Sequence, residues 1–536
     1  MKNDTTVPVA LGLDFGTESV RAVLVDARGC VRGVGTHSYR SGQIVDVLPT
    51  SGQTLPPQYA LQDPADWIDS VAIAIQQSIA QSNVVSTDIV GIGVDFTSCT
   101  MLPTLRDGTP LCQLDRFAKT PLAWPKLWKH HGAIDATRRM NLVAAERAES
   151  FMDRYGGIIG LEWFLPKLLE TIDEAPEVAD AAEVWLEAGD WLVWQLVGGD
   201  AEELPRSTCQ AGYKALWSAA EGFANDDYLT AVDPKLSEAV GKKMPGRMLS
   251  PGESAGTLCD TLAKQFGLPA GIAVSAATID AHSAVPGVGE AGPGVLVMVM
   301  GTSSCHMLNS NEGKPVAGVA GIVDGGILPG MFGYETGQAA VGDAFAWLLK
   351  LLNLDSFDVL SRDAMALPAG ADGVMCLDWM NGCRTPLMDG ALKGAFTGLS
   401  LNTTPAHMYR ALLEASAFGV RWIVDTLREG GVGVERFVAT GGLPHHNPAV
   451  VQIYADVLGF PIEVHPSEQG SAVGAAVLGM LAAGSERSGF VTIAEAASQM
   501  AAVPGSQKQI VTPIAKSGAS YDQLYARYRE LAKTFS

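Results

Sequence analysis

Two short turns, each preceded by an apolar segment, carry the residue types that bind phosphate groups. Phosphate binding needs exposed backbone N–H groups, short hydroxyl side chains and no bulky side chain in the way. The first turn starts at Asp14 and the second at Gly301, nearly three hundred residues later. If the turns face each other across a cleft, they can hold a triphosphate from both sides. The candidate phosphate-binding residues are Gly16, Thr17 and Ser19 in the first turn, and Gly301, Thr302 and Ser303 in the second.

Asp14 supplies a carboxylate, which is a hard ligand suited to Mg²⁺ directly or through water. For this segment alone, the alternative is an ordinary hairpin in which the aspartate hydrogen-bonds its own turn. A third apolar segment leads into Gly441 and Gly442, which offer a flat surface for a nucleoside. Taken together, the three segments predict a site for ATP with Mg²⁺. The chain has no GxxxxGKS or GxxxxGKT pattern, so this site is not a P-loop.

Two further aspartates follow apolar segments that are typical of buried strands. Asp280 comes after residues 272–277, and Asp95 comes after residues 91–94. A carboxylate at a strand end can accept hydrogen bonds from two neighbouring hydroxyl groups of a ligand. The alternatives are structural: Asp280 is then the N-cap of a helix that starts at Ala281, and Asp95 caps a turn.

The elements that must position these residues alternate between strands and helices. A helix is expected from Asp63 to Ala80, with Asp63 as its cap and Pro64 at its first position. The stretch from about 120 to 268 reads as mostly helical, and its tryptophans are expected in the core. Alternating or continuous apolar runs predict strands at 9–14, 19–25, 31–39, 90–95, 101–105 and 272–277.

The second half repeats this opening in outline. A strand, a turn of Gly, Thr and Ser residues, and a returning strand occur again at 294–308. A short strand is expected at 437–440, and a helix after Pro448. Residues 470–483 predict a helix of small residues that packs closely against another element. The boundary between the halves is expected near 271–294, which is rich in Gly and Pro.

The composition limits the class of protein. The chain has 536 residues, 47% of them hydrophobic and 18% charged, which predicts two or more globular domains. A formal net charge of −21 repels nucleic acid and anionic lipid, so neither is an expected partner. The eight cysteines include no CxxC pair or zinc spacing, and the first residues show no signal-peptide pattern. We therefore expect a cytoplasmic protein with reduced thiols and no membrane span; a homodimer is a further hypothesis.

The two turns and the Gly441-Gly442 pair resemble those of the sugar-kinase branch of the actin-like ATPase superfamily, the FGGY carbohydrate kinases. The likeness extends from about residue 9 to about residue 490. It implies an α/β fold of two ribonuclease-H-like domains with a central catalytic cleft. We expect a sugar-binding N-terminal domain at 1–283 and a nucleotide-binding C-terminal domain at 284–536.

Within this family, a series of short segments resembles the branch that phosphorylates L-ribulose. This likeness implies ATP-dependent formation of L-ribulose 5-phosphate and a place in L-arabinose breakdown. Each segment alone is a weak signal, but their occurrence in the same order is specific. The segments are 94–97 (VDFT), 126–131 (KLWKHH), 187–191 (EAGDW), 212–217 (GYKALW), 279–282 (IDAH), 333–338 (GYETGQ) and 381–386 (NGCRTP).

The resemblance also implies roles for particular residues. Asp280 is the general base, which contacts the substrate and accepts the proton of the sugar hydroxyl as its oxygen attacks the γ-phosphate. Asp95, Lys214 and Glu335 bind the sugar, and Ser98 lines the sugar pocket beside Asp95. For Lys214 and Glu335, the alternative is a charged residue on the surface.

Three other functions remain open from the sequence. One is a kinase for another ketopentose or a pentitol, such as D-ribulose, xylulose or ribitol, because specificity depends on a few hydrogen bonds. Another is an actin- or chaperone-like protein that binds a partner and uses nucleotide as a switch. The third is a protein that senses nucleotide or sugar without turnover. Asp280 argues against the third, because sensing needs no general base.

Overall fold

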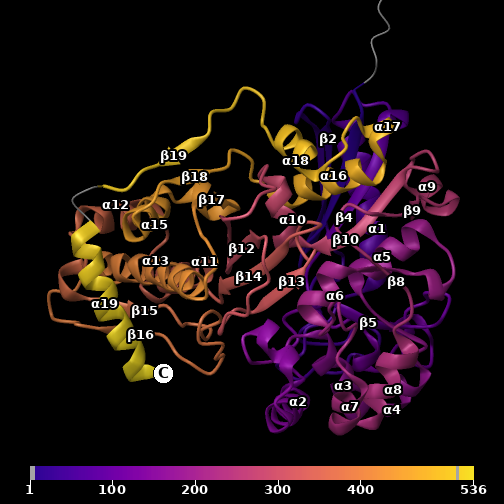
Figure 1. Ribbon diagram of the computed structural model, residues 1–536, viewed down its shortest axis with the longest axis horizontal. Helices are drawn as coiled ribbons and strands as arrows, with labels where there is room; N and C mark the ends of the chain where they lie inside the picture. The colour runs from indigo at the N-terminus through magenta and orange to yellow at the C-terminus, as the bar shows by residue number, and fades with distance from the viewer. Residues whose placement is uncertain (1–6, 515–517) are drawn as a thin grey trace, which may run out of the picture.

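Two mixed β-sheets form the frame of the molecule (Figure 1). The computed structural model describes residues 7–514 and 518–536. The strands of the first sheet lie in the order β3-β2-β1-β4-β10-β9, and β1, β4 and β10 run parallel. The carboxyl ends of these three strands therefore meet at one edge. The strands are β1 (Val9–Phe15), β2 (Ser19–Asp26), β3 (Val31–Ser38), β4 (Ile89–Phe96), β9 (Ser254–Thr257) and β10 (Ala273–Ile279).

The second sheet repeats this layout, in the order β13-β14-β12-β11-β17-β18-β19. In each sheet an antiparallel hairpin, β1–β2 or β11–β12, is continued by two parallel strands and one antiparallel edge strand. The predicted repeat of the opening in the second half is confirmed. The strands are β11 (Val295–Met300), β12 (Ser304–Ser310), β13 (Gly321–Asp324), β14 (Phe332–Gln338), β17 (Arg436–Thr440), β18 (Ile462–Val464) and β19 (Gln509–Val511).

The chain between β4 and β10 is mostly helical, as predicted, and its tryptophans are mostly buried. Two short strand pairs interrupt it: β5 (Met101–Thr104) with β6 (Val184–Glu187), and β7 (Pro205–Ser207) with β8 (Arg247–Leu249). The helices are α2 (Ile134–Arg147), α3 (Phe164–Glu174), α4 (Pro176–Ala181), α5 (Ala188–Val197), α6 (Thr208–Lys214), α7 (Asp226–Val232), α8 (Pro234–Lys243) and α9 (Asp260–Phe266).

Helix α1 (Pro64–Ala80) precedes this region and packs on β2 and β3. The Asp63 carboxylate accepts the main-chain N–H of Ala65, which confirms the predicted N-cap. The predicted strands of the first hundred residues are likewise confirmed as β1 to β5, with ends shifted by one residue or none. Local apolar spacing and capping residues therefore determine this part of the chain.

Helices of the second half surround the second sheet and connect it to the first. Helix α10 (Asp280–Gly287) lies between β10 and β11, where the chain passes from one sheet to the other. The remaining elements are α11 (Gly342–Leu351), α12 (Phe357–Ala366), β15 (Met375–Leu377), β16 (Ala395–Thr397), α13 (Pro405–Glu429), α14 (Gly442–His446), α15 (Pro448–Leu458), α16 (Gly470–Ala482), α17 (Ser485–Ser488), α18 (Ile493–Met500) and α19 (Gly518–Phe535).

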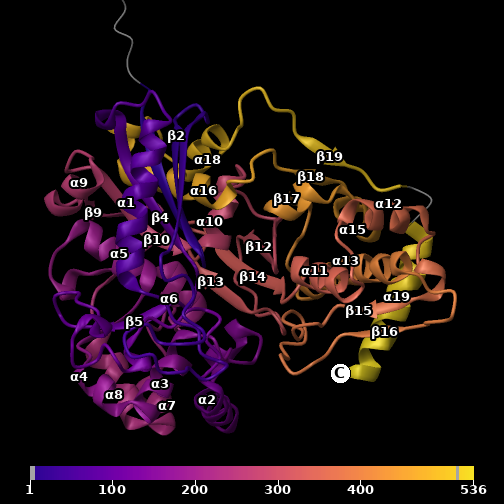
Figure 2. The ribbon, with the colours of Figure 1, turned by 180° about the vertical axis from the view of Figure 1, so that it is seen from behind.

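Helix α16 returns to the first sheet, although it comes late in the chain. In both views the yellow helices α16 and α18 lie beside the indigo strands (Figures 1 and 2). A Cβ atom at Gly93 would lie 1.7 Å from the carbonyl oxygen of Ala475, and one at Gly12 would lie 1.9 Å from that of Ala472. Only glycine permits this approach, which confirms the predicted close packing of the small-residue helix. The division of the chain at residues 283 and 284 stays a prediction.

Two expectations from composition can be compared with the structure. All eight cysteines are free thiols. None of the helices within 7–514 and 518–536 has the length and apolar character needed to cross a membrane.

Candidate active site

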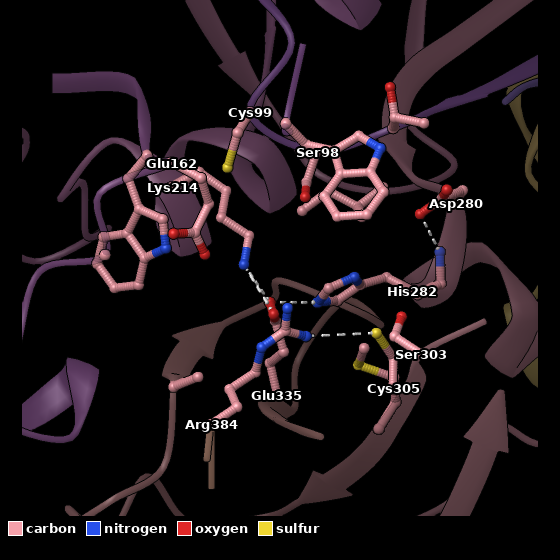
Figure 3. A pocket seen from close by; sticks show the side chains of 18 of the residues that line it. Ser98, Cys99, Glu162, Lys214, Asp280, His282, Ser303, Cys305, Glu335 and Arg384 are labelled. Atoms are coloured by element: carbon pink, nitrogen blue, oxygen red, sulfur yellow. Dashed lines mark hydrogen bonds and ion pairs between the residues drawn. The ribbon is translucent and has the colours of Figure 1, made fainter. Parts of the chain in front are cut away.

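A cavity of about 260 Å³ receives side chains from both halves of the molecule (Figure 3). The first half contributes Ser98, Lys214 and Asp280, and the second contributes Ser303 and Glu335. A larger cavity of about 590 Å³ adjoins it, because residues such as Thr302 and Arg384 line both. The smaller cavity brings together most of the predicted sugar residues.

Three carboxylates lie where the parallel strands of the first sheet end. Asp14 on β1 is paired in register with Asp95 on β4, and Asp280 follows β10 directly. Of the three, only Asp280 lines the cavity. Strand pairing therefore gathers residues that are far apart in the chain, as parallel strand ends do.

Asp95 is wholly buried, and neither carboxylate oxygen has a hydrogen-bond partner among the described residues. Burial raises the pKa of Asp95 well above its ordinary value, and the negative charges of Asp14 and Asp280 add to this effect. Asp95 does not line the cavity, and its predicted contact with the sugar stays a prediction.

Asp280 is the first residue of α10, and Ile279 occupies the N-cap position. The N-cap alternative for Asp280 is therefore wrong by one residue, although its Oδ1 accepts the main-chain N–H of Ala281 at 2.6 Å. Desolvation raises the pKa of Asp280 to about 7, and the nearby charge of Asp14 acts in the same direction. A carboxylate with a pKa near neutrality is a suitable general base.

Lys214 and Glu335 form an ion pair that joins the two halves. Lys214 ends α6, and its Nζ lies 2.7 and 2.8 Å from the two carboxylate oxygens of Glu335 on β14. Both side chains are buried, so the surface alternative is wrong for each. Burial is the largest single effect and would lower the pKa of Lys214, but the charge and the hydrogen bond of Glu335, with a contribution from Cys99, together outweigh it and the pKa is raised. Burial would raise the pKa of Glu335, but the pKa is lowered, chiefly because of the charge and the hydrogen bonds of Lys214. Both groups are therefore charged at neutral pH.

His282 also lines the cavity, with its Nε2 3.5 Å from Oε2 of Glu335. Burial lowers the pKa of His282 to about 4, so the imidazole is neutral at physiological pH. Its ring packs against Tyr213 at a centroid distance of 4.3 Å. Neither ring nitrogen of His282 has a hydrogen-bond partner among the described residues.

The two turns that are predicted to bind phosphate meet at the cavity. Thr17 from the first turn and Thr302 and Ser303 from the second all line it. The Thr17 Oγ1 accepts a hydrogen bond from Trp128 Nε1 at 3.1 Å. Inside the turns, the N–H of Gly16 bonds to the carbonyl of Ser19 at 3.0 Å, and that of Gly301 to the carbonyl of Ser303 at 2.9 Å.

Gly441 lies beside the second turn without lining the cavity. Its φ of +91° is strained for other residues, and a Cβ atom there would lie 2.5 Å from the carbonyl oxygen of Met300. Gly442 follows as the first residue of α14. Glycine at position 441 therefore lets the end of β17 pass close to Met300, and the role of the pair in binding a nucleoside stays a prediction.

The acidic strand ends fit a magnesium ion that is held largely by phosphates and water. The structure places no group of three or more carboxylate, imidazole or thiolate ligands around one point within the described residues. Mg²⁺ in phosphoryl-transfer sites usually takes one or two carboxylates and completes its shell with water and phosphate oxygens. Asp14 is partly exposed and paired with Arg21 at 3.3 Å, and Asp95 has two unpartnered oxygens. The donor set suits such an ion.

Arg384 and Glu162 are two charged residues of the cavity that were not assigned from the sequence. Arg384 lies in the loop between β15 and β16, and its Nη1 is 3.9 Å from the thiol of Cys305. No carboxylate in the described part of the chain lies within ion-pair distance of Arg384, so its guanidinium has donors for a ligand. Glu162 approaches the cavity from the first half. Arg384 belongs to the segment 381–386, but the residues of that segment do not by themselves indicate that the Arg384 side chain enters the cavity.

The duplicated sheets are those of the actin-like ATPase fold, and with this site they define a sugar kinase, which transfers a phosphoryl group to a sugar hydroxyl. The chain belongs to the FGGY family of carbohydrate kinases. The N-terminal domain of this family matches residues 9–287, and its C-terminal domain matches residues 296–483.

The chain is similar over nearly its whole length to proteins named ribulokinase. It is 42% identical to the ribulokinase of Geobacillus thermodenitrificans, with 98% of this chain and 94% of that protein covered. The ribulokinase of Mycolicibacterium smegmatis is also 42% identical, with 98% and 93% covered.

Solved structures of other sugar kinases share the fold. The xylulose kinase of Rhodospirillum rubrum has a TM-score of 0.78 and 26% identity, and 98% of each chain is covered. The gluconate kinase of Lactobacillus acidophilus has a TM-score of 0.78 and 18% identity, with 99% of this chain and 98% of that chain covered. Since kinases named for different substrates share one fold, the fold does not select the sugar.

Proposed function

We propose that this chain transfers the γ-phosphoryl group of ATP to the 5-hydroxyl of L-ribulose, giving L-ribulose 5-phosphate and ADP. The observation that carries the proposal is the cavity that joins Asp280 to the Lys214–Glu335 pair. The ribulokinase names of the similar proteins support the choice of sugar. This reaction would place the chain in L-arabinose breakdown.

Asp280 is the proposed general base. Its carboxylate accepts the proton of the 5-hydroxyl while that oxygen bonds to the γ-phosphorus. The bond from the γ-phosphorus to the β,γ-bridging oxygen breaks, and ADP leaves. With a pKa of about 7, Asp280 is largely ionised above neutral pH and still basic enough to take the proton.

The Lys214–Glu335 pair is the proposed anchor for the sugar. The Lys214 ammonium donates hydrogen bonds to sugar oxygens, and the Glu335 carboxylate accepts them from hydroxyls. Because the pair is already formed across the two halves, little ordering is needed when the sugar enters. Ser98 contributes a hydroxyl from the first half, and Arg384 lies at the end of the cavity away from Asp280 (Figure 3).

The nucleotide is proposed to lie between the turns, with its phosphates at Thr17 and Thr302 and its nucleoside near Gly441 and Gly442. Backbone N–H groups and hydroxyls of the turns would donate to the phosphate oxygens. Mg²⁺, held through Asp14 directly or by water, would neutralise phosphate charge as the bond to ADP breaks. Closing of the halves on both substrates would exclude water and limit hydrolysis of ATP.

A coupled ADP-release assay tests this function. Purified protein is given MgATP with L-ribulose, D-ribulose, D-xylulose, L-xylulose, ribitol or glycerol. We expect the highest kcat/KM with L-ribulose, and phosphorus NMR should place the product phosphate on the 5-oxygen. A higher kcat/KM for another ketopentose or for ribitol would reassign the substrate within the family. If no sugar raises ADP release above the basal rate, a nucleotide-switched binding protein becomes the better explanation.

A further inference from the structure

The C-terminal helix α19 lies beyond the part of the chain that matches the family's C-terminal domain, which ends at residue 483. In both views this yellow helix crosses beside β15 and β16 (Figures 1 and 2). Tyr521, Tyr525 and Tyr528 are spaced three or four residues apart, so they share one face of α19. All three are buried and pack around Phe418 of α13. The end of the chain therefore docks on the second half of the molecule.

Tyr528 connects this helix to two other buried polar residues. Its hydroxyl donates to Oδ1 of Asp378 at 2.8 Å, and Gln338 Nε2 donates to Oδ2 of the same carboxylate at 2.8 Å. Gln338 also donates to the carbonyl of Ser416 at 2.9 Å. Tyr528, Asp378 and Gln338 are 1%, 6% and 5% exposed, so water does not compete for these bonds. Each carboxylate oxygen of Asp378 has one protein donor.

Tyr528 is bonded to Asp378 and, through Asp378, is connected to Gln338. Each of these two residues belongs to a segment that also lines the cavity of Lys214 and Asp280, which we call the sugar cavity. Gln338 ends β14, the strand that carries Glu335. Asp378 begins the loop of residues 378–394 between β15 and β16, which brings Arg384 into the cavity.

The same loop is fastened to β14 a second time. The N–H of Thr385, next to Arg384, bonds to the carbonyl of Gly337 at 3.2 Å. The loop of residues 378–394 is thus hydrogen-bonded to β14 at two points, and one of these bonds is the one between Asp378 and Gln338. We propose that Tyr528 is a positioning residue for the sugar site, which holds Asp378 and thereby sets Arg384 relative to Glu335.

Tyr521 provides a matched comparison on the same helix. It is also 1% exposed, and its hydroxyl donates to Oε1 of Glu414 at 3.2 Å and accepts from Arg410 at 2.7 Å. Neither Glu414 nor Arg410 lines the sugar cavity. Loss of either tyrosine hydroxyl leaves a buried carboxylate short of one donor, so both losses should lower stability. Only the loss of the Tyr528 hydroxyl should change the position of Arg384 in the sugar cavity.

The test compares Tyr528→Phe with Tyr521→Phe in the full-length protein. We expect Tyr528→Phe to raise the KM for L-ribulose about three- to tenfold while kcat and the KM for MgATP change less than about twofold. Tyr521→Phe should change the sugar KM less than about twofold. An equal rise in both variants would mean general loosening of the second half and would overturn the proposal, as would an unchanged KM in Tyr528→Phe.

A second measurement does not depend on catalysis. Amide hydrogen exchange of residues 379–394 should quicken in Tyr528→Phe and stay at the wild-type rate in Tyr521→Phe. Asp378→Ala, which removes the acceptor of the Tyr528 hydroxyl, should reproduce the effect, and adding Tyr528→Phe to Asp378→Ala should change little, because Tyr528 acts through Asp378. Additive effects would contradict the proposal.

The KM measurement rests on the proposed function, whereas the hydrogen-exchange measurement does not, so the proposed function and the role of Tyr528 can fail separately. Wild-type protein without sugar-dependent ADP release would overturn the proposed function, while hydrogen exchange would still decide whether Tyr528 holds the loop. Sugar-dependent activity with identical exchange in both tyrosine variants would overturn only the positioning role.

Discussion

The two sheets share one layout but differ in what stands at equivalent strand ends. In the first sheet the ends of β1, β4 and β10 carry Asp14, Asp95 and Asp280. In the second sheet β11 runs into Gly301 and β17 into Gly441. The same frame thus presents carboxylates on one side of the site and glycine backbone with hydroxyls on the other.

This difference separates two chemical tasks. Burial and the nearby charge of Asp14 raise the pKa of Asp280, which suits its proposed role as the base. Their negative charge is a poor surface for a triphosphate, whereas backbone N–H groups and hydroxyls bind one well. A duplicated fold can therefore divide proton transfer and anion binding between its copies. Substitutions on the two sides should accordingly affect different kinetic parameters.

The largest effect is expected at the base. Asp280→Asn keeps the shape but cannot take the proton, so kcat should fall about 10²- to 10⁴-fold, with a smaller change in the sugar KM. ADP release measures both. Asp190→Asn is the control, since Asp190 is equally an aspartate buried in the first half but does not line the cavity. A kcat loss of similar size in both variants would remove the base assignment.

The pH dependence tests the carboxylate cluster. Because the pKa of Asp280 is about 7, kcat/KM should fall about tenfold per pH unit below 7 and level off above it. Since the folded pKa lies above the unfolded value near 3.9, the native state keeps a proton that the unfolded state has lost. Asp280 therefore destabilises the fold increasingly as pH rises from about 4 to 7. The Tm of Asp280→Asn minus that of wild type should therefore be larger at pH 8 than at pH 4. An equal Tm difference at both pH values would refute the raised pKa.

The ion pair between the two sides is the next test. Lys214→Met leaves the buried Glu335 carboxylate without its partner, and breaking such a pair costs about 3–5 kcal/mol. We expect this loss in chemical denaturation, together with weaker sugar binding in calorimetry. Lys242→Met removes an exposed pair with Glu238 by the same substitution and should cost under about 1 kcal/mol. Equal losses would show that burial of the Lys214 pair contributes nothing.

The smallest effect is expected on the glycine side. In Gly441→Ala the added Cβ would lie 2.5 Å from the Met300 carbonyl oxygen, so the neighbouring turn must shift. The KM for MgATP should rise about tenfold, equivalent to about 1.4 kcal/mol, while the sugar KM stays within about twofold. Gly489→Ala has a similar positive φ of +79° but meets no atom within 4 Å, so it should leave the KM for MgATP unchanged. A change in the sugar KM instead would contradict the division between the sheets.

Much of the frame could be predicted because local patterns determine it. The strands of the first hundred residues follow from apolar runs between turn residues, and α1 from its Asp63 cap and Pro64. The small residues of α16 predicted close packing, but not the partner, which is the first sheet. Similarly, Asp280 and Ser98 could be named from their segments, and both line the cavity.

The sequence by itself determined the elements, the two turns for which phosphate binding is proposed, and the membership in a kinase family. Only the tertiary structure decided which of the candidate side chains share a cavity. It paired Lys214 with Glu335, 121 residues apart, and it left Asp95 buried away from the cavity. It also raised the pKa of Asp280 to about 7. The physical reason is that apolar spacing and capping act over a few residues, whereas burial and charge at a site depend on everything that packs around it.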